Sequence, residues 1–206
     1  MSPQASPVYF WEAEVEIETN DLAFSPQTAS EGRGALAKQI FTADWLHDGV
    51  IWFSPAKRLG GWLKAQMPLA RSTYANQMAA VKVFPADGED EYVPIAGVGD
   101  LVGGKTPLPK TSQLPEGLPI PFWTYINVPQ EKGTGTRVAP TFWYELHKPV
   151  KHRVRVMSFA RGISPEIVKE ALSKLGRATG IGDKHSVGKG RFKLLKFEAK
   201  QEKLSL

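Results

Sequence analysis

Near its C-terminus the chain reads Arg177-Ala178-Thr179-Gly180-Ile181-Gly182-Asp183-Lys184-His185-Ser186-Val187-Gly188-Lys189-Gly190-Arg191-Phe192. Two Gly-x-Gly pairs bracket a five-residue polar loop. Glycine allows positive φ and lets a bulky partner approach the backbone N–H groups. Four basic side chains add positive charge at the same place: Lys184, His185, Lys189 and Arg191. The stretch therefore predicts a loop that binds an anionic backbone.

The residues on either side of this loop have the patterns of a strand, a helix and a second strand. Residues 152–159 alternate basic and apolar side chains, as a half-buried strand does. The run Ser164-Pro165-Glu166 is a helix start, with an N-cap, proline at the first position and an acid suited to the helix dipole. An apolar stripe continues until Gly176, and residues 191–198 predict the last strand.

The N-terminal part has the same order of elements. Apolar residues alternate with glutamates in residues 11–18, which predicts a half-buried strand. Ser54 is a suitable N-cap and Pro55 a suitable first residue for a helix that we expect to end at Pro68. Residues 78–84 predict the next strand. The order is therefore βαββαβ, and the predicted fold class is α+β with a ferredoxin-like or RRM-like core.

The glutamates of the first strand, Glu12, Glu14, Glu16 and Glu18, lie on one face of it. Carboxylates in such a row are typical of a solvated face, and a metal site is the alternative. RNA-recognition motifs bind bases on aromatic side chains of an open sheet face. Because a row of glutamates repels nucleic acid, we expect binding through loops and helix ends instead.

A long irregular segment separates the two halves. Ten of the 16 prolines fall between Pro85 and Pro149. We predict a core formed by residues 1–84 and 150–206, and an insertion of extended segments and hairpins at 85–149. Aromatic strand pieces are expected at residues 122–126 and 141–144. A long insertion is usually functional, which suits a finger that reaches a partner or a neighbouring subunit. A surface loop without a partner is the alternative for its glycine-rich tips.

The composition limits the class of protein. A chain of 206 residues with 42% hydrophobic content can bury a core without covalent staples. The absence of cysteine excludes disulfides, thiolate metal sites and cysteine nucleophiles. No apolar run is long enough to cross a bilayer, and the first residues lack a signal pattern. We therefore expect a cytoplasmic protein with no membrane partner.

The charge is distributed unevenly. The net charge is +5, but residues 146–206 hold 15 Lys and Arg against 5 Asp and Glu. Residues 1–145 hold 11 against 16. A cationic cluster of this kind is typical of proteins that bind a phosphate backbone. A solvated basic face without a partner is the alternative.

A phosphate-loop pattern occurs in the insertion, where residues 99–106 fit G-x-x-x-x-G-K-[ST]. In nucleotide-binding proteins the Lys-Ser/Thr pair opens a helix whose N-terminus holds the phosphates. Pro107 and Pro109 follow at once, and proline pushes the residue before it away from the helical region. The pattern therefore does not predict nucleotide hydrolysis, and no cofactor is expected.

Two segments resemble a known superfamily. Gly180-Ile181-Gly182 and Gly188-Lys189-Gly190, with five residues between them, are similar to the C-terminal glycine-rich loop of the repeat-associated mysterious proteins (RAMPs). RAMPs build CRISPR effector complexes. Residues 55–64 resemble the Pro-Gly-Ser-Ser-Leu-Lys-Gly-x-Leu-Arg helix start of the backbone-forming subunits. The matching positions are Pro55, Leu59, Gly61, Leu63 and Lys64, and the departures are Ala56, Lys57, Arg58 and Gly60.

The resemblance implies a non-catalytic RNA-binding backbone subunit of a CRISPR-type ribonucleoprotein effector complex in antiviral defence. Such a subunit holds the sugar-phosphate backbone of single-stranded guide RNA without reading sequence. Its partners are copies of itself, other effector subunits and target DNA or RNA, and it needs no metal. The residues that the resemblance selects for nucleic-acid binding are Lys57, Arg58, Lys64, Gly180, Gly182, Lys184, His185, Gly188, Lys189 and Arg191.

Two alternatives remain open. A metal-independent endoribonuclease that processes guide RNA needs a histidine as general acid or base, for which His152 and His185 are candidates. A phage protein that binds single-stranded nucleic acid would stack bases on the aromatic residues of the insertion: Trp123, Tyr125 and Trp143.

Overall fold

The computed structural model describes residues 8–24, 27–28, 44–47, 50–97, 120–129, 136–182 and 188–204. Its helices are α2 (Pro55–Ala70) and α3 (Pro165–Leu175), with short 3-10 turns at Ser72–Tyr74 and Met78–Ala80. Its strands are β1 (Val8–Thr19), β2 (Leu22–Phe24), β3 (Gln27–Thr28), β4 (Asp44–His47), β5 (Val50–Phe53), β6 (Val81–Pro85), β7 (Val93–Gly97), β8 (Ile120–Pro129), β9 (Thr136–Leu146), β10 (Val150–Ser158) and β11 (Phe192–Leu204). No helix in these ranges is long and apolar enough to cross a membrane.

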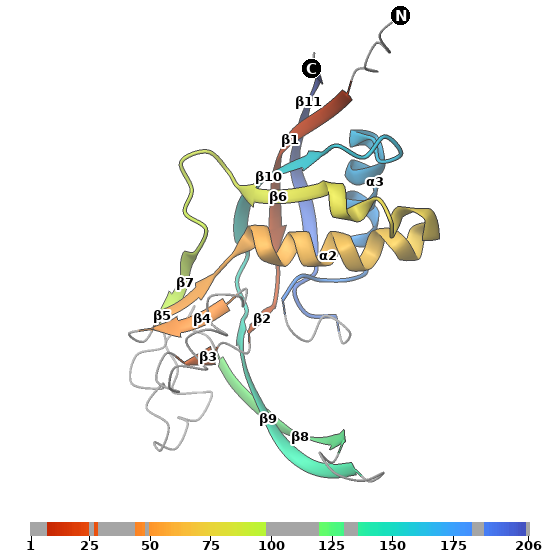
Figure 1. The fold of residues 1–206 in the computed structure, drawn as a ribbon. Coiled ribbons are helices and arrows are strands. Elements are labelled where there is room, and N and C mark those ends of the chain that lie inside the picture. Colours follow the sequence, from red (N-terminus) through yellow and green to blue (C-terminus); the bar gives the residue numbers. More distant parts are fainter. Residues whose placement is uncertain are drawn as a thin grey trace, which may run out of the picture.

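A four-stranded antiparallel sheet with the order β11-β1-β10-β6 is the centre of the molecule (Figure 1). Along the chain, α2 lies between β1 and β6, and α3 lies between β10 and β11. Each helix therefore joins two strands that have one other strand between them. The predicted strands at residues 11–18, 152–159 and 191–198 and the predicted helices at Pro55 and Pro165 are confirmed within a mixed α+β structure.

The hydrophobic core lies between this sheet and the two helices. The helix α2 packs against β6 and β10, and α3 packs against β11 and β1. The apolar row of β1 is fully buried there, from Trp11 to Ile17. The Trp11 indole donates a 2.7 Å hydrogen bond to the Ile163 carbonyl, which satisfies its one polar atom. Burial of this face leaves the glutamate row on the opposite, open face of the sheet.

Two predicted boundaries are wrong. The helix α2 continues past Pro68 to Ala70, because a proline near a helix end removes one hydrogen bond whose acceptor, on exposed Lys64, can face water. Arg71 N–H still donates to the Met67 carbonyl at 3.1 Å, which completes the last turn. The strand expected at residues 78–84 begins only at Val81, since a 3-10 turn occupies Met78–Ala80.

The segment 85–149 contributes strands to two further sheets. The hairpin β8–β9 extends away from the central sheet in Figure 1 and confirms the strand pieces predicted at residues 122–126 and 141–144. The strand β9 also pairs with β2, and β7 pairs with β5. Strands from the segment 85–149 are thus hydrogen-bonded to strands that precede it in the sequence.

Basic residues flank the glutamate row on the open face. Glu14 and Glu16 lie opposite Arg155 and Arg153 of β10, and Glu16 also lies opposite Lys196 of β11. Lys196 Nζ is 3.2 Å from a Glu14 carboxylate oxygen. Neighbouring strands thus place cations beside the row, which weakens the repulsion expected from the glutamates alone.

Candidate nucleic-acid interface

A hollow of about 240 Å³ lies between α2 and the first Gly-x-Gly pair. We call it the α2–glycine hollow. Lys57 and Arg58 enter it from the first turn of α2, and Gly180 and Gly182 form its opposite wall. Its complete lining is Lys57, Arg58, Gly61, Trp62, Ala65, Gln66, Gly180, Ile181 and Gly182. Residues that are far apart in the sequence thus line the same hollow.

Trp62 fixes this arrangement. Its indole Nε1 lies 3.3 Å from the Thr179 carbonyl oxygen and 3.1 Å from Thr179 Oγ1. Its ring meets the Phe192 ring edge to face, with centroids 5.0 Å apart. Because Thr179 precedes the glycine loop and Phe192 follows it, one buried side chain of α2 holds both ends of the loop.

The glycines allow two backbone segments to cross closely. A Cβ at Gly180 would lie 1.9 Å from the Lys189 carbonyl oxygen, and a Cβ at Gly190 would lie 1.8 Å from the Ile181 carbonyl oxygen. The Ile181 N–H donates to the Gly190 carbonyl at 2.9 Å, and the Gly190 N–H donates to the Asp21 carbonyl at 3.0 Å. The expectation that the loop presents its amides to a ligand is therefore wrong for Ile181 and Gly190, which use theirs within the fold.

Three of the loop glycines have left-handed backbone conformations. The φ angles are +92° at Gly182, +86° at Gly188 and +65° at Gly190. L-residues with a Cβ adopt this region at a cost of about 1–2 kcal/mol. The predicted need for positive φ is confirmed at these positions.

Lys57 is held by residues of the same chain. Its Nζ lies 2.7 Å from Glu91 Oε1 and 2.5 Å from the Tyr92 hydroxyl, and 4.6 Å from the centre of the Tyr92 ring. Burial lowers the pKa of Lys57, but the hydrogen bonds and charges of Glu91 and Tyr92 outweigh burial and raise this pKa above its usual range. Lys57 is therefore charged at physiological pH and already has a carboxylate partner.

Lys189 is also held within the fold. Its Nζ lies 2.7 Å from Glu145 Oε2, and the Glu145 side chain is only 6% exposed. The other Glu145 oxygen accepts a 2.9 Å hydrogen bond from Trp143 Nε1. His147 Nε2 is 3.2 Å from Glu145, and His147 Nδ1 is 2.8 Å from Asp21. This cluster joins the base of β9 to the glycine loop.

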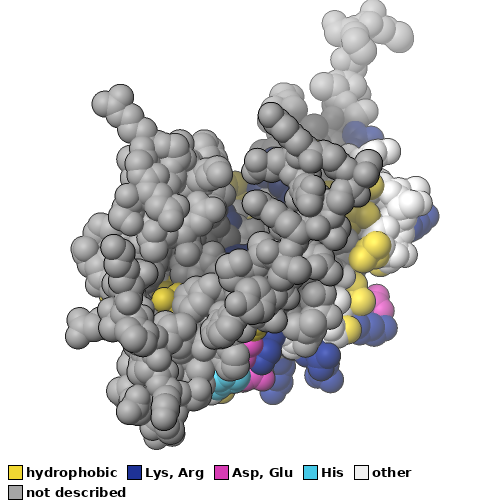
Figure 2. Space-filling model, turned by 90° about the horizontal axis from the view of Figure 1, so that it is seen from below, with side chains coloured by type: hydrophobic (Ala, Val, Ile, Leu, Met, Phe, Trp, Pro, Cys, Tyr) yellow, Lys and Arg dark blue, Asp and Glu magenta, His cyan; other side chains and the backbone are white. Residues whose placement is uncertain are grey.

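The other selected cations differ in exposure. Arg58 is half-buried, whereas Lys64 and Arg191 are exposed, and Lys64 does not line the α2–glycine hollow. Lys184 and His185 lie outside the described residues. Figure 2 shows the molecule from below. The Lys and Arg side chains seen there stand beside Asp and Glu side chains, so the described part of that face has mixed charge.

The sequence did not predict the side chains that contact the two lysines: Glu91 and Tyr92 for Lys57, and Glu145 for Lys189. Tyr92 is 35 residues from Lys57 in the sequence, and Glu145 is 44 residues from Lys189. No local pattern marks pairs at such separations. The phosphate-loop pattern at residues 99–106 lies outside the described residues, as do the side chains of Trp123 and Tyr125. Across the described ranges, no group of three or more His, Asp or Glu could hold a metal ion.

His152, the second histidine candidate, is a core residue. It is 2% exposed, its ring lies 5.0 Å from the Phe53 ring, and Nε2 is 3.0 Å from Thr19 Oγ1. Burial lowers the pKa of His152 to about 4. The imidazole is therefore neutral at physiological pH and has no exposed edge for a scissile phosphate of a large RNA.

The lowered pKa of His152 predicts acid sensitivity. Between pH 6.5 and pH 4 the unfolded chain binds a proton at this residue and the folded chain does not, so stability falls as pH falls. As the pH falls from 6.5 to 4, the free energy of unfolding falls by about 3 kcal/mol from this residue alone. We expect His152→Gln to remove this part of the pH dependence in urea titrations at pH 7, 5 and 4. An unchanged pH dependence in the variant would contradict the burial of a neutral imidazole.

Comparisons with known proteins give likenesses among solved structures. No protein-family model matches the chain, and no curated protein matches it. A chain of the cryo-EM structure of the Type III-B Cmr-beta bound to cognate target RNA is similar, with a TM-score of 0.45 and 14% sequence identity. The likeness covers 92% of this chain and 60% of that chain. A likeness at this level carries no argument about the function of this chain.

Proposed function

We propose that the chain binds single-stranded RNA through its sugar-phosphate backbone at the α2–glycine hollow. The observation that carries this proposal is that Lys57 and Arg58 line the same hollow as Gly180 and Gly182. A cationic helix start facing a close-packed glycine turn suits a polyanion of repeating geometry. Exposed Lys64 and Arg191 extend the positive charge beyond the hollow.

We further propose that this unit is a RAMP-like backbone subunit of a CRISPR-type ribonucleoprotein complex in the cytoplasm. The strand order β11-β1-β10-β6 with two crossover helices supports a ferredoxin-like core of residues 1–84 and 150–206. The hairpin β8–β9 within residues 85–149 suits a finger that contacts a neighbouring copy. On this proposal the protein polymerises along guide RNA without reading its sequence.

Titration of labelled single-stranded RNA and DNA of equal length, at several salt concentrations, tests the proposal. We expect RNA binding whose logarithm falls linearly with the logarithm of salt, with a slope of about 0.7 for each phosphate contact. The mass of the complex should increase in steps of one protein as the RNA is lengthened. Salt-independent binding, or no binding at low salt, would refute backbone recognition.

A cleavage assay with the same RNA distinguishes an endoribonuclease from a non-catalytic binding protein. Incubation of the RNA without metal yields a defined cleavage product only if the protein is an enzyme. Of the two histidine candidates, His152 is buried and neutral, which favours the non-catalytic proposal. Stronger binding of DNA than of RNA would favour the phage single-strand binder.

A further inference from the structure

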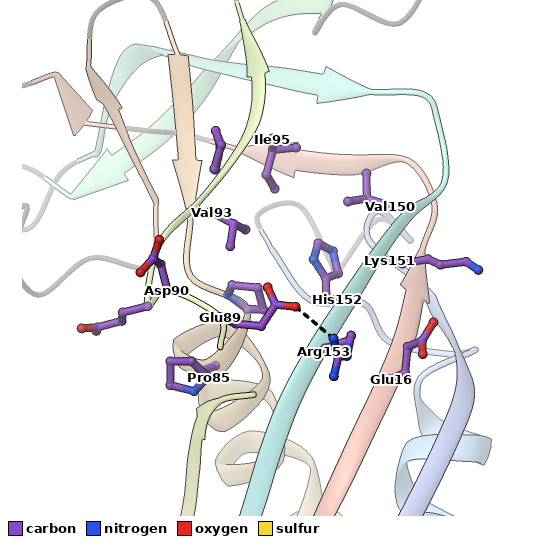
Figure 3. Close-up of a pocket in the computed structure, with 14 residues that line it drawn as sticks. Glu16, Pro85, Glu89, Asp90, Val93, Ile95, Val150, Lys151, His152 and Arg153 are labelled. Atoms are coloured by element: carbon purple, nitrogen blue, oxygen red, sulfur yellow. Dashed lines mark hydrogen bonds and ion pairs between the residues drawn. The ribbon is translucent and has the colours of Figure 1, made fainter. Parts of the chain in front are cut away.

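A second hollow, of about 320 Å³, lies among the start of α2, β7 and β10 (Figure 3). We call it the acidic hollow, because four carboxylates line it against two cations: Glu16, Glu89, Asp90 and Glu91 against Lys151 and Arg153. Glu91 lines this hollow and Lys57 lines the α2–glycine hollow, so their ion pair links the two linings.

Apolar side chains also line the acidic hollow. Val93 and Ile95 project into it from β7, and Val150 faces them from β10 (Figure 3). Glu89 reaches toward Arg153, with 3.4 Å between Oε1 and Nη1. Asp90 has no ion pair within the part of the chain that the structure describes. The hollow thus combines apolar surface with polar groups, as small-molecule sites do.

His152, one of the residues that line this hollow, has a buried hydrogen-bond acceptor. Thr19 Oγ1 is 3.2 Å from the Val150 carbonyl oxygen, to which the hydroxyl must donate. The hydroxyl then accepts from His152 Nε2 at 3.0 Å, so the ring hydrogen is on Nε2. Nδ1 of His152 is left with a lone pair, buried and without a partner among the described residues. Such an atom in a native protein usually has a ligand or a water.

We propose that the acidic hollow binds a short aliphatic diamine or polyamine. Both ends of such a ligand are ammonium groups at neutral pH. One donates a hydrogen bond to His152 Nδ1, the methylene stem lies along Val93, Ile95 and Val150, and the other meets the carboxylates of Glu89 and Asp90. The Asp90 carboxylate, which has no ion pair among the described residues, disfavours a phosphate or another anion at this end of the hollow. This inference does not depend on nucleic-acid binding at the α2–glycine hollow.

Calorimetric titration with butane-1,4-diamine tests the inference, together with the 15N resonance of His152 Nδ1. We expect saturable binding that shifts this resonance, because Nδ1 gains a hydrogen bond. The double variant Glu89→Gln with Asp90→Asn should bind at least tenfold more weakly, since a hydrogen bond to a charged group contributes that much. Both positions are on the exposed rim, so the variant keeps the core intact.

Two controls make the result specific. Glu170→Gln removes an exposed carboxylate of α3 that does not line the hollow and should leave diamine binding unchanged. Butane-1,4-diol has the same length without charge and should not bind. Nα-acetyl-lysine amide distinguishes a free diamine from a lysine side chain of a protein, and its tighter binding would assign the same chemistry to a protein source. Absence of binding by both amines, or equal binding of the diol, would overturn the inference.

Discussion

Replacement of Gly190 with alanine is expected to lower the free energy of unfolding by about 3 kcal/mol or more. The new Cβ would lie 1.8 Å from the Ile181 carbonyl oxygen, so the two segments must separate. Separation lengthens the hydrogen bond between the Ile181 N–H and the Gly190 carbonyl. A residue with a Cβ also pays about 1–2 kcal/mol at a φ of +65°, and each lost hydrogen bond adds about 1 kcal/mol. Urea denaturation of the variant and the wild-type protein measures the total change in the free energy of unfolding.

Gly61 is the matched control for this experiment. It is an exposed glycine inside α2, and a Cβ there has no heavy atom within 4 Å. Gly61→Ala should therefore stabilise the protein by about 0.5–1 kcal/mol, because alanine loses less backbone entropy in a helix. If Gly190→Ala proved as harmless as Gly61→Ala, the close crossing at the glycine loop would be wrong.

Reversal of charge at Arg58 and Lys64 together should weaken RNA binding on the order of a hundredfold at low salt, as expected for lost phosphate contacts. Arg58 lines the α2–glycine hollow, and Lys64 lies on the exposed side of the same helix. Lys57 is a poorer probe, because Lys57→Glu would also place two carboxylates together at Glu91. Fluorescence anisotropy with Arg58→Glu plus Lys64→Glu gives the affinity, and circular dichroism shows whether the fold is kept.

Lys169→Glu provides the comparison at an exposed position of α3 that lines neither hollow. It changes the net charge of the protein without changing the proposed interface, so its affinity should fall by much less than that of the double variant. An equal loss per reversed charge would mean that binding follows net charge alone.

Much of the fold follows from local patterns. The alternation from Trp11 to Glu18 places β1, and Ser164 with Pro165 places the start of α3, because periodicity and capping act within a few residues. Pro68 is misleading because a proline in the last turn removes only one hydrogen bond, which the exposed end of α2 tolerates.

The candidate site is less predictable, because its charges are decided by tertiary contacts. Lys57 and Lys189 look alike as free cations in the sequence, yet Glu91 and Glu145 hold them in ion pairs. The loop glycines were expected to expose amides, whereas Gly190 uses its N–H within the fold. The spacing of glycines indicates that a tight turn is needed but does not tell whether a ligand or another chain segment requires it.

The central claim is that RNA lies at the α2–glycine hollow, and backbone amide chemical shifts measured during titration with single-stranded RNA test it most directly. We expect the largest changes at residues 57–66 and 180–182, with β1 and β10 nearly unchanged. On the open sheet face, Phe84 of β6 lies opposite Arg155, and both Phe84 and Phe159 are exposed. Changes confined to that face, with none in residues 57–66 and 180–182, would contradict the claim.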